Sequence, residues 1–153
     1  MSTIYVDNLR PNLDTGVHIP GHVIQTVIAP ENLSIIYFGN TLGSFVSFNS
    51  VNFTPLRSDS LILVSYRQSV NISSSGTATF QVRQDGTYIT QDEIASPPTG
   101  RRTYGGVGFG RNGHTAGVTY SFSFGAVQSG ATSAINYTIN AGGNILLVQE
   151  IGQ

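Results

Sequence analysis

The stretch Val118-Thr-Tyr-Ser-Phe-Ser-Phe124 decides the fold class. Its large apolar side chains occupy every second position, and Thr or Ser fills the positions between them. Successive side chains of an extended strand point to opposite faces, so this spacing gathers the apolar side chains on one face. A helix would spread the same side chains around its circumference. The stretch therefore predicts a β-strand with one buried face.

The same period of two continues upstream of this stretch. Ala78, Phe80 and Val82 alternate with polar residues, and the pair Asp85-Gly86 separates them from a second run at 87–90. Two alternating runs joined by a two-residue turn that suits positive φ predict a β-hairpin.

Further strands are predicted over several other short runs. Clusters of Gly, Pro, Asn and Ser separate them, and no window of a dozen residues has a helical period. These predicted strands cover residues 22–28, 34–38, 44–48, 60–67, 134–139 and 145–151. This many short strands with regular turn signals predict an all-β domain, namely a sandwich, a jelly roll or a barrel.

The composition limits the classes of function. The 153 residues fit one domain, and the absence of cysteine excludes disulfides and thiolate metal sites. Charged residues make up 10% of the chain and the net charge is −1, so there is no basic surface for nucleic acid. No apolar run is long enough to span a membrane as a helix. A nearly neutral surface favours packing against neighbouring subunits.

The first 21 residues differ from the rest of the chain. Asn, Pro, Asp and Gly interrupt any longer element there, so we expect an extended arm over 1–21 and a β-sandwich over 22–153. An arm with scattered apolar residues usually docks on another surface, although it could instead add an edge strand to its own sheet. The candidate docking residues of the arm are Ile4, Tyr5, Val6 and Leu9.

Several phrases of the chain resemble small virion proteins of marine and cyanobacterial tailed phages. The phrases Tyr5-Val-Asp-Asn-Leu-Arg-Pro-Asn12 and 16–27 resemble their opening segment and first strand. Phe53-Thr-Pro followed by the strand 60–65 is similar to their central step, and the phrase 144–152 is similar to their last strand. The resemblance covers most of the chain.

The resemblance implies a trimeric jelly roll similar to the tumour-necrosis-factor and complement globular-head fold. It also implies a virion protein made in the host cytoplasm, whose partners are further copies of itself and major capsid or tail proteins. The lack of a repetitive shaft favours a capsid decoration or head-fibre protein over a tail-fibre or tail-knob component that binds a receptor. A lectin-like module that binds a host surface glycan is the alternative from another class.

No catalytic or metal-binding group is recognisable in the sequence. His18 and His22 would not meet on an extended chain, and Asp92 and Glu93 point to opposite faces of a strand. No Gly-x-Ser-x-Gly turn occurs that could carry a nucleophile. We therefore expect no enzymatic activity, no metal and no cofactor. Three copies of one histidine around a three-fold axis are the one metal arrangement left open.

The stretch 100–113 is unusually rich in glycine. Its Gly106-x-Gly-x-Gly110 motif lacks the following helix that a phosphate-binding loop needs. The stretch is interpreted either as a long loop or bulged edge strand, or as a loop that binds a partner or receptor. Arginine and tyrosine dominate interface hot spots. The candidate contacts are therefore Arg101, Arg102, Tyr104 and Arg111.

The chain holds more apolar residues than a thin sandwich needs, which predicts a homotrimer. An obligate interface is where such an excess is buried. The residues assigned to the core or to the trimer interface are Tyr120, Phe122, Phe124 and Leu147, with Ile135 and Ile145 beside them.

Overall fold

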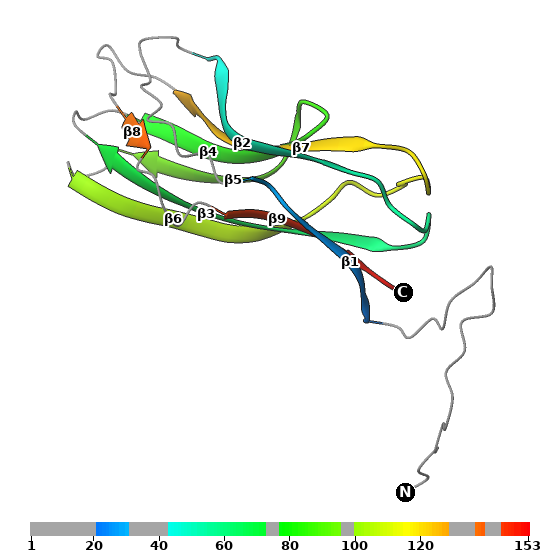
Figure 1. Ribbon diagram of the computed structural model, residues 1–153. Helices are drawn as coiled ribbons and strands as arrows, with labels where there is room; N and C mark the ends of the chain where they lie inside the picture. Colours follow the sequence, from blue (N-terminus) through cyan, green and yellow to red (C-terminus); the bar gives the residue numbers. More distant parts are fainter. Residues whose placement is uncertain (1–20, 31–42, 73–76, 96–99, 129–136, 140–144) are drawn as a thin grey trace, which may run out of the picture.

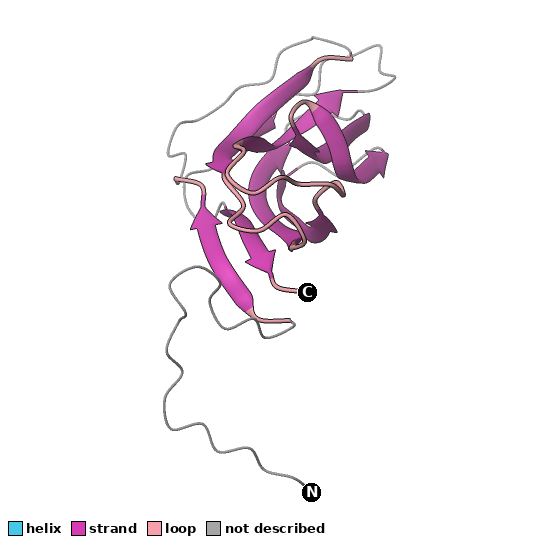
Figure 2. Cartoon of the chain, turned by 90° about the vertical axis from the view of Figure 1, so that its right-hand side faces the viewer, coloured by secondary structure: helices cyan, strands magenta, loops and turns pink. Residues whose placement is uncertain are grey.

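The structure is a computed structural model that describes residues 21–30, 43–72, 77–95, 100–128, 137–139 and 145–153. Within these ranges the regular elements are β-strands, with no helix that could cross a membrane (Figures 1 and 2). The strands are β1 (Val23–Ile28), β2 (Phe45–Phe53), β3 (Leu61–Ile72), β4 (Thr77–Gln84), β5 (Thr87–Ala95), β6 (Gly100–Phe109), β7 (Tyr120–Gln128), β8 (Tyr137–Ile139) and β9 (Ile145–Ile151).

The strands form two antiparallel sheets that pack face to face (Figure 1). The five-stranded sheet has the order β1-β9-β3-β6, with β8 paired to β3, and the four-stranded sheet has the order β2-β7-β4-β5. Without the short β8, the eight remaining strands are divided between the sheets in the interleaved order of a jelly roll. The predicted all-β, jelly-roll-like sandwich is therefore confirmed.

The predicted hairpin is present between β4 and β5. Asp85 and Gly86 form its turn with φ angles of 48° and 81°. The predicted strands at 22–28 and 145–151 match β1 and β9 closely, whereas β2 and β3 run several residues further than predicted. The predicted strand at 34–38 lies outside the described residues.

The interpretation of residues 100–113 as one long loop is wrong, because residues 100–109 form β6. This strand pairs with β3 over ten residues without a bulge and lies at the edge of its sheet. Its glycines make room for neighbouring side chains. A Cβ on Gly106 would lie 2.7 Å from the Tyr66 hydroxyl oxygen, and one on Gly108 would lie 2.7 Å from Cγ2 of Thr90. Gly106 and Gly108 are therefore required for close packing, and neither has positive φ.

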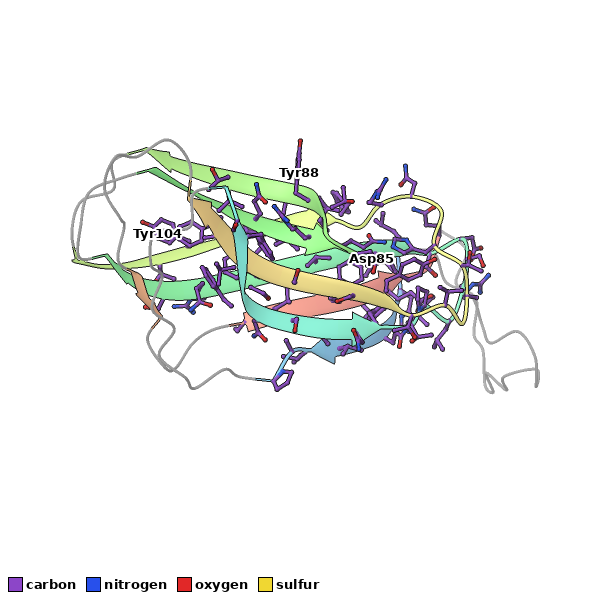
Figure 3. All side chains as sticks on the ribbon, turned by 90° about the horizontal axis from the view of Figure 1, so that it is seen from above. Asp85, Tyr88 and Tyr104 are labelled. Atoms are coloured by element: carbon purple, nitrogen blue, oxygen red, sulfur yellow. The ribbon has the colours of Figure 1, made fainter. Side chains whose placement is uncertain are left out.

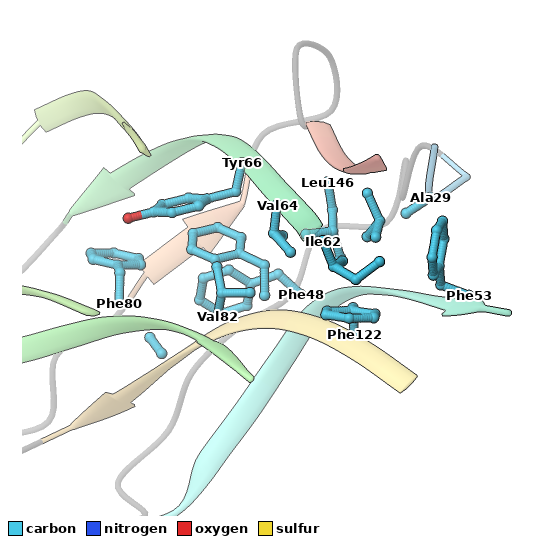
Figure 4. Packing of buried hydrophobic residues seen from close by; sticks show 13 residues of the cluster. Ala29, Phe48, Phe53, Ile62, Val64, Tyr66, Phe80, Val82, Phe122 and Leu146 are labelled. Atoms are coloured by element: carbon cyan, nitrogen blue, oxygen red, sulfur yellow. The ribbon is translucent and has the colours of Figure 1, made fainter. Parts of the chain in front are cut away.

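The core lies between the sheets and is rich in aromatic rings (Figure 4). Phe122 and Phe124 on β7 are fully buried, so of the two predicted roles they have that of core residues. Tyr66 on β3 stacks on Phe124 with ring centroids 4.7 Å apart, which joins the two sheets. Stacked and edge-on aromatic pairs add to the free energy gained from burial alone.

Candidate functional site

An apolar surface crosses the outer side of the five-stranded sheet. Residues paired across an antiparallel ladder point to the same side, so the register of β1, β9, β3 and β6 lines them up in rows. The two central rows, called the apolar face from here on, are Ile28, Leu147, Ser65 and Val107, and next to them Thr26, Gln149, Leu63 and Phe109.

The most prominent side chains of the apolar face are strongly exposed. Ile28 and Val107 are each 60% exposed and Phe109 is 58% exposed. Val23 and Ile145 lie beyond its two ends and are each 40% exposed, and the exposed Arg67 is paired with Ile145. None of the eight residues in the two rows is charged.

The outer side of the four-stranded sheet is more polar, although Tyr88, paired with Arg83, is exposed on it. Ser50 of β2, Ser123 of β7 and Arg83 of β4 form one row across it. The ring of Phe45 in the same sheet is covered by the Arg83 guanidinium, 4.1 Å from the ring centroid. The water-facing side of an antiparallel sheet is normally polar. Of the two outer sides described, the apolar face is therefore the one whose chemistry suits the binding of another protein surface.

Leu147 is the predicted interface residue that the structure places in the apolar face, half-buried on β9. Phe122 and Phe124 point away from it into the core, and Tyr120 packs against the core at one end of the sandwich. The predicted arm contacts Ile4, Tyr5, Val6 and Leu9 lie outside the described residues, as do His18 and Ile135.

The four predicted contacts of the glycine-rich stretch do not form one site. Arg101 and Arg102 begin β6, where their backbones pair with the end of β3, and their side chains lie outside the described residues. Arg111 follows the other end of β6, about 30 Å away at roughly 3.3 Å per residue. Tyr104 points into the sandwich and stacks on Phe80, with ring centroids 4.6 Å apart.

A buried carboxylate holds the loop between β2 and β3 in place. Glu150 on β9 is fully buried and accepts hydrogen bonds from the backbone N–H groups of Leu56 and Arg57, 2.9 and 2.8 Å long. Gln25 Nε2 and Ser60 Oγ donate two more, both 2.7 Å long. Four donors thus bind one carboxylate and link the loop to β1 and β9.

The hydrogen bonds decide the pKa of this carboxylate. Burial by itself raises the pKa of Glu150, because the charged form loses its hydration. The donors at Leu56, Ser60, Gln25 and Arg57 outweigh that effect and hold the pKa below its usual value. Glu150 is therefore ionised at neutral pH and acts as a structural anchor.

A cleft of about 230 Å³, called the end cleft from here on, opens at the same end of the sandwich. It lies between the loop that precedes β3 and the loop that follows β6. The lining residues are mostly polar, and the argument below uses Asp59, Ser60, Arg111, Asn112, Gly113 and His114.

His114 forms part of the wall of the end cleft and is only 5% exposed. Its ring packs edge-on against Tyr120, with centroids 4.8 Å apart, and its Nε2 has no hydrogen-bond partner. Burial lowers the pKa of the imidazole, and the carboxylates of Asp85 and Glu150 oppose this only in part. His114 is therefore neutral at pH 7, with one buried nitrogen unpaired.

Neither the apolar face nor the end cleft with its Glu150 anchor was predicted from the sequence. The sequence nevertheless contains a pattern that points to each of them. The runs Leu61–Val64 and Ile145–Val148 are apolar at every position, which is typical of strands with apolar residues on both faces. Glu150 continues the inward series of Leu146 and Val148, so a carboxylate stands where the period of two predicts a core residue.

No protein-family model matches the chain, and no curated protein matches it. Among solved structures, that of the Gx strain of infectious bursal disease virus superposes with a TM-score of 0.54 at 12% identity. That of the Gt strain superposes with a TM-score of 0.50 at 11% identity. Both alignments cover 97% of this chain, which spans 36% and 42% of the two viral chains.

A carbohydrate-binding module, CBM36 in complex with calcium and xylotriose, superposes with a TM-score of 0.36 at 15% identity, over 83% of this chain and 99% of the module. The likeness to the two viral chains shows the fold. The chain is a jelly-roll sandwich of a kind that also occurs within structures of a virus.

Proposed function

We propose that the protein is a structural protein of a virus particle that associates with further copies of itself through the apolar face. One observation carries the proposal: the apolar face is uncharged and holds several strongly exposed apolar side chains, whereas the outer side of the other sheet is more polar. The viral chains that share the fold support a role in a particle.

A second copy of the chain is the occupant that the chemistry of the apolar face favours. The two rows are uncharged and the net charge of the chain is −1, so no charged partner is recognised there and copies repel one another little. Obligate interfaces between identical subunits are more apolar than other interfaces. The assembly proposed is the trimer that the resemblance implies.

The finer role proposed is that of a phage capsid decoration or head-fibre protein, docked on major capsid or tail proteins by the arm and acting without catalysis. Gly21 supports a boundary close to the predicted one, because its N–H donates to the Gly152 carbonyl oxygen at 2.7 Å and so joins the sheet. The arm proposed for docking therefore ends at residue 20.

Two matched variants test self-association. Phe109 on the apolar face and Tyr88 on β5 are both aromatic and both 58% exposed, and Tyr88 projects away from the sandwich (Figure 3). We expect Phe109→Glu to convert a trimer into monomers in sedimentation velocity at micromolar concentration, because it buries a charge in the interface. Tyr88→Glu should leave the trimer intact. A monomeric wild type would overturn the proposal.

Removal of residues 1–20 tests the docking role separately. The shortened protein should remain a trimer with an unchanged Tm. It should no longer co-sediment with virus particles to which the full-length protein binds. Continued binding to the particle would show that the arm is not the docking segment. A loss of folding would show that it is an integral part of the sheet.

A further inference from the structure

Three consecutive residues that line the end cleft have backbone N–H groups with no hydrogen-bond partner among the described residues. These residues are Asn112, Gly113 and His114, which directly follow Arg111 in the loop after β6. The N–H groups on both sides of them all donate to protein acceptors. These bonded neighbours are Gly110, Arg111, Thr115 and Ala116.

The backbone conformation at this point suits the binding of an anion. Gly113 has a φ of 85°, and a Cβ built on it would meet nothing within 4 Å, so the space beside it is open. Successive N–H groups around a left-handed residue can converge on one point and form a concave site for an anion. An L side chain at residue 113 would be strained in this conformation.

The charged groups around the end cleft leave one cation free. The guanidinium of Arg111 forms no ion pair with any described residue, and its side chain is exposed. Arg57 occupies both oxygens of the Asp59 carboxylate, at 3.1 and 3.3 Å. Glu150 lies behind Ser60 with all its acceptor capacity directed at the four donors described above. Donors are thus free in the cleft while its nearest carboxylates are already bonded.

His114 packs in the wall of the same cleft. Its Nε2 is buried in the cleft wall without a hydrogen-bond partner, which is rare for a side-chain nitrogen in a folded protein. Gly110, which also lines the cleft, lies next to the ring: a Cβ on it would be 3.3 Å from Nε2. The nitrogen is therefore covered by the cleft wall and is not itself exposed to the cleft.

We propose that the end cleft binds a small oxyanion, a sulfate or a carboxylate group, held by the backbone N–H groups of 112–114 and by the guanidinium of Arg111. Its volume of about 230 Å³ is below that of a typical pocket for a drug-sized ligand and suits an anion with a few attached atoms. The inference does not rest on self-association, because the cleft and the apolar face share no residue.

Titration with sodium sulfate, monitored by amide NMR at constant ionic strength, tests the site. Sulfate stays fully ionised across the working pH range, so its own charge does not vary. We expect saturable shifts of the Asn112, Gly113 and His114 amides, and a dissociation constant at least about tenfold larger in Arg111→Ala, since hydrogen bonds to charged groups are the stronger ones.

Arg67→Ala is the matched control because it removes the same charge from an exposed site. Arg67 lies five residues along β3 from Ile62 at the cleft, or about 16 Å away. It should leave the sulfate affinity unchanged. Equal weakening in both variants, or shifts that do not saturate, would mean that sulfate acts only through the general charge of the protein and would overturn the proposal.

Glucuronate and glucose then distinguish the source of the anion. Binding of glucuronate more tightly than sulfate points to an acidic sugar, and binding of sulfate alone points to a free ion or a sulfate ester. Binding of glucose as tightly as glucuronate would show that the hydroxyl groups are recognised, and the oxyanion proposal would then be wrong.

Discussion

Ser60 Oγ donates a 2.7 Å hydrogen bond to Glu150 Oε1 across 90 residues of sequence. The bond joins the residue before β3 to β9, next to it in the five-stranded sheet. Because the same carboxylate also holds the backbone of Leu56 and Arg57, the position of one wall of the end cleft depends on it.

Glu150→Gln should lower the free energy of unfolding by about 2–3 kcal/mol, since hydrogen bonds to a buried charged group are lost. A glutamine amide turns a donor toward at least one of the donors that now face the carboxylate. Urea unfolding at pH 7 measures the change. Gln149→Ala, on the outer side of the same strand, is the control and should stay within about 0.5 kcal/mol. Equal effects of the two would show that the carboxylate is not an anchor.

Stability should fall in two steps on acidification. The folded-state pKa of His114 lies below 6.5, so only the unfolded chain takes up this proton as the pH first falls through 6.5, and stability declines there. The folded-state pKa of Glu150 lies below 4.5, so its contribution is complete above pH 4.5 and is lost as the pH falls through that lower pKa. Urea unfolding between pH 8 and 3 measures both steps. His114→Gln should remove the first step and Glu150→Gln the second.

Tyr104→Ala should destabilise the fold by about 2–3 kcal/mol, because the ring stacks on Phe80 within the sandwich. Tyr88→Ala removes the same side chain from an exposed site and should cost about 0.5 kcal/mol or less. Figure 3 shows the two rings in these different positions. Thermal melts of both variants decide the matter, and a neutral Tyr104→Ala would mean that this ring is a surface contact after all.

Gly108→Ala should cost about 1–3 kcal/mol, as is typical of overpacking. The added Cβ would lie 2.7 Å from Cγ2 of Thr90 on β5, the edge strand of the other sheet. Thr90→Ser removes that methyl group, so the double variant should recover part of the loss in urea unfolding. No recovery would show that the glycine is needed for another reason.

The fold class could be predicted because its signals are local. The alternation at 120, 122 and 124 and the Asp85-Gly86 turn depend only on neighbouring residues, and both appear in the structure as predicted. Strand β6 could not be recognised as a regular strand, because its inward positions at 106 and 108 are glycines. Glycine is needed at these two positions because of Tyr66 and Thr90, whose side chains come close to them only after folding.

The candidate surfaces were predicted less well. The sequence shows which strands carry apolar residues, but the register between β1, β9, β3 and β6 decides which of them share a face. Leu147 was therefore assigned with Phe122 and Phe124, although it points to the opposite side of its sheet from the core. The end cleft depends on two loops that are distant in sequence and meet through tertiary contacts.

The hydrogen bond from Gly21 to Gly152 places the start of the described domain at the same end of the sandwich as the end cleft. The two ends of the sandwich therefore differ. The chain enters the sandwich at the cleft end, while Arg101 and Arg102 begin β6 at the other end, opposite Asn71 and Val70. Ten residues of β3 separate the two ends, about 33 Å at roughly 3.3 Å per residue. In a domain tethered by residues 1–20, the cleft end would lie nearest the surface that carries the domain, and the start of β6 would lie at the far end.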